Sequence, residues 1–148
     1  MTILPTLEGG LSIQPESDAD WAVLDMIVVD MGRPGHLAES LAGLMDDESE
    51  WDEWVVPDLV ESFSKQTGYV AAAIQYARTF SEESILITPN GAEYWYGAVN
   101  QARLALQARY KLDAIGSLDD APEEVVQAYF RDRFYTALLS FLLEYVMS

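Results

Sequence analysis

The side chains best suited to chemistry in this sequence recur at helical spacing between residues 93 and 107. Intervals of three and four residues would place them on one face of a helix, and they are Glu93, Tyr96, Asn100, Arg103 and Gln107. A guanidinium group beside an amide can bind a carboxylate or a peptide backbone. The same side chains can instead pair with acids of an earlier helix, such as Asp25 or Asp30, and only hold two helices in register. The sequence leaves both alternatives open.

Other groups that commonly catalyse reactions are scarce. The chain has no cysteine and a single histidine, His36, which excludes disulfides, thiol catalysis and Cys-ligated zinc. Ser40 and Glu39 lie near His36, but neighbours on one helix form no oxyanion hole. The sequence has neither a phosphate-binding glycine motif nor the Glu-x-x-His motif of di-iron bundles. It therefore predicts no catalytic residues, no metal site and no cofactor, and it favours a non-enzymatic protein.

Negative charge is concentrated in the first part of the chain. Acidic residues outnumber basic ones 25 to 8, for a formal net charge of −17, and residues 1–61 hold 15 acids and one base. The densest run, with two tryptophans, comprises Asp46, Asp47, Glu48, Glu50, Trp51, Asp52, Glu53 and Trp54. One interpretation is a solvated face that keeps the protein soluble. The other is a landing site for a protein partner with a basic surface, anchored by both tryptophans.

Composition also restricts the partners and the compartment. Binding a phosphate backbone or an anionic membrane requires clustered Lys and Arg, so both are poor partners for this chain. The first ten residues lack the basic and long apolar regions of a signal peptide. The most apolar stretch, residues 134–147, is shorter than the roughly 20 residues that span a membrane. We therefore expect a cytoplasmic protein that does not enter a membrane.

The polar and acidic residues must be positioned by a mainly helical fold. We expect a single domain over residues 1–148, built as a bundle of about five helices. The first helix opens at Ser17 and stops at Gly32, and a short one covers about 36–45. The others are expected to begin at Pro57, at Thr88 with Pro89 in the first turn, and at Asp120 as part of a capping box.

Two short segments have the character of strands. Residues 11–14 alternate apolar and polar, and residues 84–88 are β-branched and bounded by a turn and a proline. Two short strands do not stand alone, so we expect them to pair as a small antiparallel ribbon on the helical body.

The last predicted helix is apolar on every side after Arg133. Such a helix lies at the centre of a bundle, or a partner subunit covers part of it. The sequence thus also predicts a homodimer through the C-terminal helix, provided the other helices leave one of its faces open.

The run from Ile87 to Arg109 resembles a known family. It combines a strand ending in Thr, a Trp-containing helix, an Asn-x-x-Arg-Leu-x-Leu core and a following Arg, and it is similar to the bacterial family called domain of unknown function 2017. The matching residues are Trp95, Asn100, Arg103, Leu104, Leu106 and Arg109, whereas Gln107 stands where that family often has Gly. The resemblance covers about residues 84–148 and implies a mainly helical fold and no known reaction. Genes of that family often lie beside the gene of the Clp protease adaptor, which implies a protein-quality-control context.

Three functions of different classes are compatible with these patterns. The first is a non-enzymatic interaction or adaptor protein that binds a basic partner through residues 46–54. The second is a small-molecule or peptide-carboxylate binder, or an enzyme, that uses the Tyr96–Asn100–Arg103 face. The third is an acidic mimic of nucleic acid, whose carboxylates imitate phosphates.

Overall fold

The computed structural model describes residues 1–32 and 51–148, and for 51–57 and 59 it describes the backbone alone. Within these ranges the chain forms four α-helices and one antiparallel sheet of three strands, which confirms the mainly helical prediction. The predicted short helix over 36–45 lies outside the described residues. The helices are α1 (Asp18–Met31), α3 (Trp51–Thr79), α4 (Ala92–Tyr110) and α5 (Glu123–Tyr145), with a short 3-10 helix, η1, at Leu112–Ala114.

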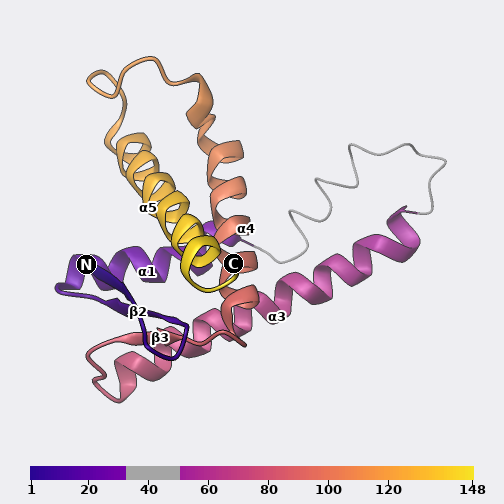
Figure 1. The fold of residues 1–148 in the computed structure, drawn as a ribbon. Coiled ribbons are helices and arrows are strands. Elements are labelled where there is room, and N and C mark those ends of the chain that lie inside the picture. The colour runs from indigo at the N-terminus through magenta and orange to yellow at the C-terminus, as the bar shows by residue number, and fades with distance from the viewer. Residues whose placement is uncertain (33–50) are drawn as a thin grey trace.

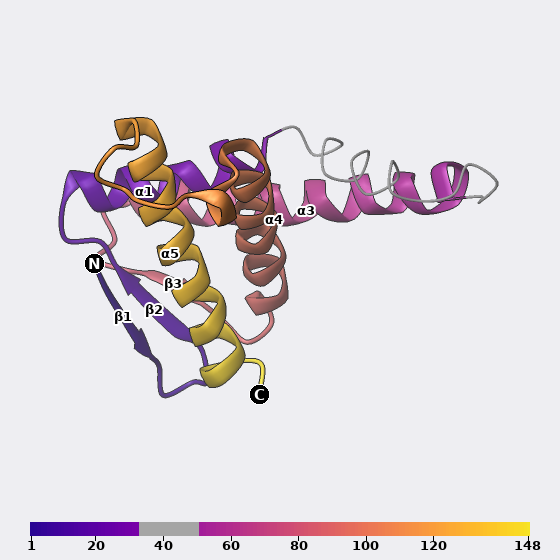
Figure 2. The same cartoon turned by 90° about the horizontal axis from the view of Figure 1, so that it is seen from above.

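Helix α4 forms the centre of this arrangement and packs against α1, α3 and α5 (Figures 1 and 2). Its buried residues include Trp95, which is fully enclosed, together with Ala92, Ala98, Val99, Gln101, Ala102 and Leu106. The small residues let neighbouring helices approach α4 on several sides. The all-round apolar character of α5 therefore does not make α5 the central helix. Instead, α5 buries one side against the body and leaves large apolar side chains exposed on another.

The sheet has one strand more than the predicted ribbon. The expected antiparallel pairing is present between β2 (Leu11–Gln14) and β3 (Ile85–Ile87), with Leu11 opposite Ile87. The additional strand, β1 (Thr2–Pro5), pairs with the other side of β2. Its sequence carries no strict alternation and ends in a proline, which is tolerated at an edge because it needs no ladder hydrogen bond. The prediction of two strands was wrong for this reason.

The turn between β1 and β2 depends on Gly10. The N–H of Gly10 donates to Oγ1 of Thr6, and its carbonyl accepts from the N–H of Thr6. A Cβ atom at Gly10 would overlap with the backbone oxygen of Ile87, which the sheet holds in place. Only glycine therefore lets β2 and β3 approach each other at this point.

We accordingly expect Gly10→Ala to lower the free energy of unfolding by about 1–3 kcal/mol, because strand β3 must move away. The measurement is a denaturant titration followed by circular dichroism. A matched control is Gly68→Ala in α3, where an added Cβ meets no atom within 4 Å. That change is expected to stabilise the protein by up to about 1 kcal/mol. Equal stability of the Gly10→Ala variant and the wild type would contradict this close approach of β2 and β3.

The starts of the helices follow the sequence signals only in part. Ser17 caps α1 as predicted, since its Oγ accepts from the N–H of Asp20 at 3.3 Å, and Gly32 ends the helix with a φ of 68°. The other starts are displaced from their predicted positions. Helix α3 begins at Trp51, six residues before the predicted Pro57, because acidic residues in a first turn favour the helix macrodipole. Pro57 therefore lies inside the helix rather than in its first turn.

The segments that precede α4 and α5 form turns instead of the predicted caps. The Oγ1 and carbonyl oxygen of Thr88 both accept from the N–H of Gly91, so Pro89 lies in a tight turn and α4 begins at Ala92. Pro122, not Asp120, is the N-cap residue of α5, and it makes no side-chain capping bond. Its fixed φ suits the residue at which the chain enters the helix.

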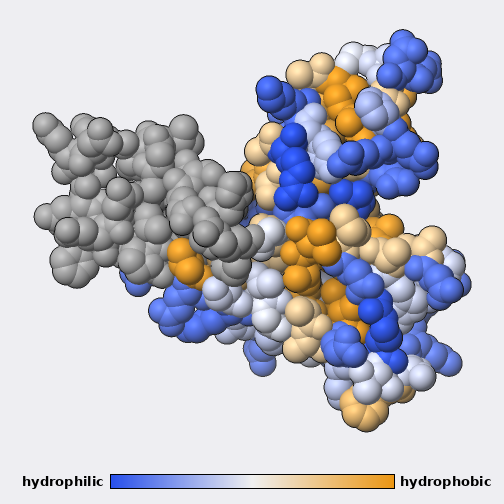
Figure 3. All heavy atoms as spheres, turned by 180° about the vertical axis from the view of Figure 1, so that it is seen from behind, coloured by the Kyte–Doolittle hydropathy of each residue, from blue (hydrophilic) through white to orange (hydrophobic). Residues whose placement is uncertain are grey.

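The face seen from behind carries both hydrophilic and hydrophobic residues. Hydrophobic residues form patches across the middle of this face, and hydrophilic residues surround them (Figure 3). None of the helices in the described ranges carries a stretch long and apolar enough to cross a membrane.

Candidate functional site

The predicted acidic partner site is described by the structure only in part. Its first four acids, Asp46, Asp47, Glu48 and Glu50, lie outside the described residues. Trp51, Asp52, Glu53 and Trp54 form the first turn of α3, where only the backbone is described. The role of this block in binding a basic partner therefore stays a prediction.

The predicted polar face is present on α4. Glu93, in the first turn, is exposed, and the other four side chains are half-buried: Tyr96, Asn100, Arg103 and Gln107. The amide of Gln107 donates to Oδ1 of Asp132 on α5 at 3.0 Å. Nε of Arg103 lies 3.7 Å from the same oxygen, within ion-pair distance but without a hydrogen bond. These two side chains thus link α4 to α5, and the carboxylate-binding interpretation of the face stays a prediction.

The partners suggested for Arg103 from the sequence were wrong. Asp25 and Asp30 lie on different sides of α1, and each is held by another arginine: Asp25 by Arg78 and Asp30 by Arg131. Arg103 instead faces Asp132, because α5 packs along α4 while α1 crosses it (Figure 1).

A buried polar cluster joins α1 to α5. Asp30 is fully buried, and Nε and Nη2 of Arg131 donate to its two carboxylate oxygens at 2.8 and 3.1 Å. The hydroxyl of Tyr135, also fully buried, donates to Oδ2 of Asp30 at 2.6 Å. Both carboxylate oxygens are therefore satisfied, as a buried charge requires. Asp30 and Tyr135 are closed to solvent and the Arg131 side chain is only 12% exposed, so we interpret the cluster as a structural element.

The pKa values of this cluster agree with a structural role. Burial, together with the hydrogen bond to Asp30, raises the pKa of the Tyr135 hydroxyl far above its ordinary value. Burial alone would lower the pKa of Arg131, but the hydrogen bonds and charge of Asp30 raise it. Tyr135 thus stays neutral and Arg131 stays charged. The sequence contained one signal for the cluster, since Asp30 follows Ile27 at helical spacing on the buried face of α1.

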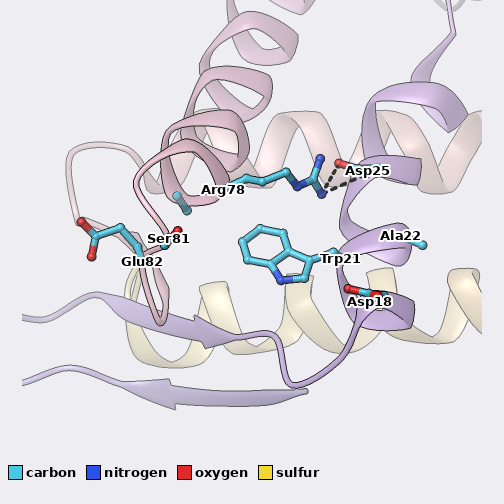
Figure 4. A pocket seen from close by; sticks show the side chains of 8 residues that line it. Asp18, Trp21, Ala22, Asp25, Arg78, Ser81 and Glu82 are labelled. Carbon is cyan, nitrogen blue, oxygen red and sulfur yellow. Dashed lines mark hydrogen bonds and ion pairs between the residues drawn. The ribbon is translucent and has the colours of Figure 1, made fainter.

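A surface hollow lies between α1 and the C-terminal end of α3, and we call it the α1–α3 hollow. Its volume is about 490 Å³, and it is lined by Asp18, Trp21, Ala22, Asp25, Ala77, Arg78, Ser81 and Glu82. Nη2 of Arg78 donates to both carboxylate oxygens of Asp25 at 2.9 Å. The guanidinium carbon also lies 5.0 Å from the centre of the Trp21 ring (Figure 4). The Asp25 pair and the Trp21 ring together hold Arg78 beside the hollow.

Two carboxylates of this hollow are free to meet an external cation. Asp18 and Glu82 are exposed, and in the described part of the chain neither forms an ion pair with Lys or Arg. Figure 4 shows them at opposite ends of the labelled group, with the Trp21 ring between them. A basic side chain entering at either end would meet a negative charge, and in the middle it would meet, like Arg78, an aromatic face.

A second hollow adjoins the first, and we call it the α3–β3 hollow. Its volume is about 370 Å³, and it shares Ala77 and Glu82 with the α1–α3 hollow; the remaining lining residues are Ala73, Tyr76, Ser84, Ile85 and Leu86. Tyr76 and Leu86 are well exposed, and the Tyr76 ring packs on that of Phe80 with 4.8 Å between centres. An acidic, aromatic surface therefore passes directly into an apolar one. Sequence reasoning missed this site because its residues come from two distant segments, 18–25 and 73–86, which only the fold brings together.

A comparison with family models matches the chain to a family over nearly its whole length. The model described as domain of unknown function (DUF2017) matches residues 5–147. The match extends well beyond the C-terminal region in which the sequence pattern resembled that family. The chain matches no curated protein and no solved structure.

Proposed function

Because the chain belongs to the DUF2017 family of unknown function, we propose a function from its own surface. The protein is a non-enzymatic interaction module that binds a basic, partly apolar segment of a partner protein. The observation that carries this proposal is the continuity of the α1–α3 hollow with the α3–β3 hollow. A segment lying across both would meet carboxylates first and apolar side chains next.

The charge of the chain supports a basic partner. A net charge of −17 attracts cationic surfaces from a distance and raises their rate of association at low salt. Asp18 and Glu82 would each attract a Lys or Arg of the partner, and Trp21 would contact the stem of such a side chain. The acidic block at residues 46–54 belongs to the same proposal as a second, separate contact for a basic surface.

The apolar part of the site would add affinity to the electrostatic attraction between the protein and a basic partner. Leu86 is 63% exposed on β3, and Tyr76 of α3, which lines the same hollow, is also exposed. The Tyr76 ring packs against the exposed ring of Phe80, which follows α3. Aromatic and large apolar side chains that lose contact with water contribute most of the affinity at interfaces. The family resemblance adds an adaptor role in protein quality control, in the cytoplasm, to this proposal.

The proposal predicts that the protein binds a fluorescent peptide with two lysines followed by two leucines. Two control peptides replace the lysines by glutamates or the leucines by serines, and both are expected to bind at least about tenfold more weakly. Fluorescence anisotropy at low and high salt measures the affinity, which is expected to fall with salt because exposed charges are screened. Equal binding of all three peptides would contradict the proposal.

Variants of the protein locate the binding surface. The combination Asp18→Asn with Glu82→Lys is expected to weaken binding of the basic peptide about tenfold or more. The matched control, Asp113→Asn with Asp120→Lys, makes the same change of charge in the exposed loop between α4 and α5, at the other end of the molecule (Figure 1). An equal loss in both variants would show that net charge alone attracts the peptide.

A pull-down from native cell lysate then tests the two acidic surfaces separately. One bait carries the Asp18 and Glu82 changes, and another has the acids of residues 46–53 neutralised with Trp51→Ala and Trp54→Ala. A partner lost only with the first bait assigns it to the hollows. A partner lost only with the second assigns it to the acidic block. A nucleic-acid-binding protein among the captured partners would favour the mimic hypothesis instead.

A further inference from the structure

The outer side of α5 carries an apolar stripe that the described part of the chain covers only in part. Its members recur at intervals of 4, 3, 4 and 4 residues and are Phe130, Phe134, Ala137, Phe141 and Tyr145. Phe130 is 61% exposed and Tyr145 46%, Ala137 is exposed, and Phe134 and Phe141 are half-buried. Figures 1 and 2 show α5 on the outside of the body, with α4 and α1 on its inner side. A stripe of this length on one helix exceeds the scattered apolar residues of an ordinary surface.

We propose that this stripe, the α5 stripe, binds the α5 stripe of a second copy of the chain, with the two helices antiparallel. The stripe is close to symmetric about Ala137. In an antiparallel pair centred there, Phe134 of one copy faces Phe141 of the other. Phe130 likewise faces Tyr145, so every large side chain of the stripe meets an aromatic partner.

Charges on one flank of the stripe specify this direction. Arg133 and Glu144 are exposed and lie 11 residues apart, almost three helical turns, so they lie on the same side of the helix. Neither forms an ion pair in the described part of the chain. The antiparallel pair brings Arg133 of each copy beside Glu144 of the other. A parallel pair would set this flank of each helix against the opposite flank of its partner, so Arg133 and Glu144 would not pair across the interface.

The expected dimer is a modest one. A contact along about four turns of a single helix pair buries less surface than the roughly 1,200 Å² of a standard stable interface. We therefore expect monomer and dimer to exchange at concentrations of about micromolar or above. This interface is separate from the proposed peptide-binding hollows, which lie on α1, α3 and β3.

Sedimentation velocity over a concentration series tests the proposal. The wild type is expected to shift from monomer to dimer, and Arg133→Glu and Glu144→Arg are each expected to weaken dimerisation about tenfold or more, since symmetry repeats the pair. The double variant Arg133→Glu with Glu144→Arg is expected to recover the wild-type affinity. All three changes are on the surface, and circular dichroism checks that the fold is kept. A wild type that stays monomeric to high micromolar concentration would overturn the proposal, as would charge reversals without effect.

Disulfide trapping tests the direction of the helices, since the natural chain has no cysteine. Arg133→Cys and Glu144→Cys are made as separate proteins and oxidised alone or as a mixture. The antiparallel pair is expected to give cross-linked dimers mainly in the mixture. Cross-linking of each protein with itself, and not in the mixture, would overturn the antiparallel arrangement.

Discussion

Asp30→Ala is expected to lower the free energy of unfolding by about 3–5 kcal/mol, far more than the loss of an exposed ion pair would cost. The change removes the only described partner of the Arg131 guanidinium and leaves the Tyr135 hydroxyl without its acceptor. A mostly buried arginine left without a counter-charge accounts for most of the loss. Denaturant unfolding at neutral pH, followed by circular dichroism, measures it.

The chain provides a matched control for this prediction on the same helix. Asp25 makes an ion pair of the same two-oxygen kind with Arg78, but both side chains are close to half-exposed. Asp25→Ala is expected to cost at most about 1 kcal/mol, because water replaces the lost partner. Equal losses for Asp30→Ala and Asp25→Ala would contradict the assignment of Asp30 to a buried cluster.

Removal of the whole cluster separates its charge from its packing. The triple variant Asp30→Leu, Arg131→Met and Tyr135→Phe leaves no unpaired polar group inside. It is expected to be more stable than Asp30→Ala, since replacing a complete buried ion pair by apolar residues is often close to neutral. A triple variant less stable than the single one would show that the cluster contributes through its geometry rather than through its charge balance.

Stability is expected to fall steeply in alkaline solution because of Tyr135. Burial and the hydrogen bond to Asp30 raise the pKa of this hydroxyl in the folded protein. The pKa of a tyrosine in the unfolded chain is about 10. The contribution of Tyr135 is therefore fully present below about pH 10 and is lost as the pH rises further. Each pH unit above that point is expected to remove about 1.4 kcal/mol.

Tyr135→Phe provides the control for the alkaline prediction. This variant is expected to lose about 1.5–3 kcal/mol at neutral pH, as a hydrogen bond to a charged group is removed, and to show a shallower decline above pH 10. Tyr110→Phe removes a more exposed hydroxyl, bonded to Glu124, and is expected to keep most of the wild-type decline. Unfolding titrations between pH 8 and about pH 12 provide the comparison. The prediction would be contradicted if the free energy of unfolding fell equally with pH in the wild type and in the Tyr135→Phe variant.

Helical segments could be predicted well from the sequence because their signals are local. The helix predicted to begin at Pro57 falls within α3, and its buried residues, Val70, Ile74 and Ala77, recur at helical spacing. The Ser17 cap and the Gly32 stop of α1 were also predicted correctly. Each of these features depends on residues three or four positions apart, which the order of the chain already brings together.

Helix boundaries at prolines and the third strand could not be predicted in the same way. Pro57 and Pro89 both suit a first helical turn, but one lies inside α3 and the other in a turn before α4. Strand β1 forms because β2 offers it a free edge, and its own four residues carry only a weak signal. In each case, contacts with other parts of the same chain decided between conformations that the local sequence permits.

For the candidate site, the sequence determined the kinds of groups and the tertiary structure decided which of them meet. The acidic excess, the lack of cysteine and the apolar last helix were determined by the sequence alone, and with them the classes of partner and chemistry. Only the fold decided that Asp30 meets Arg131, 101 positions away, and that Arg78 lies over Trp21. The reason is that an ion pair or a hollow depends on distances between side chains of different elements, and only the packing of helices around α4 sets those distances.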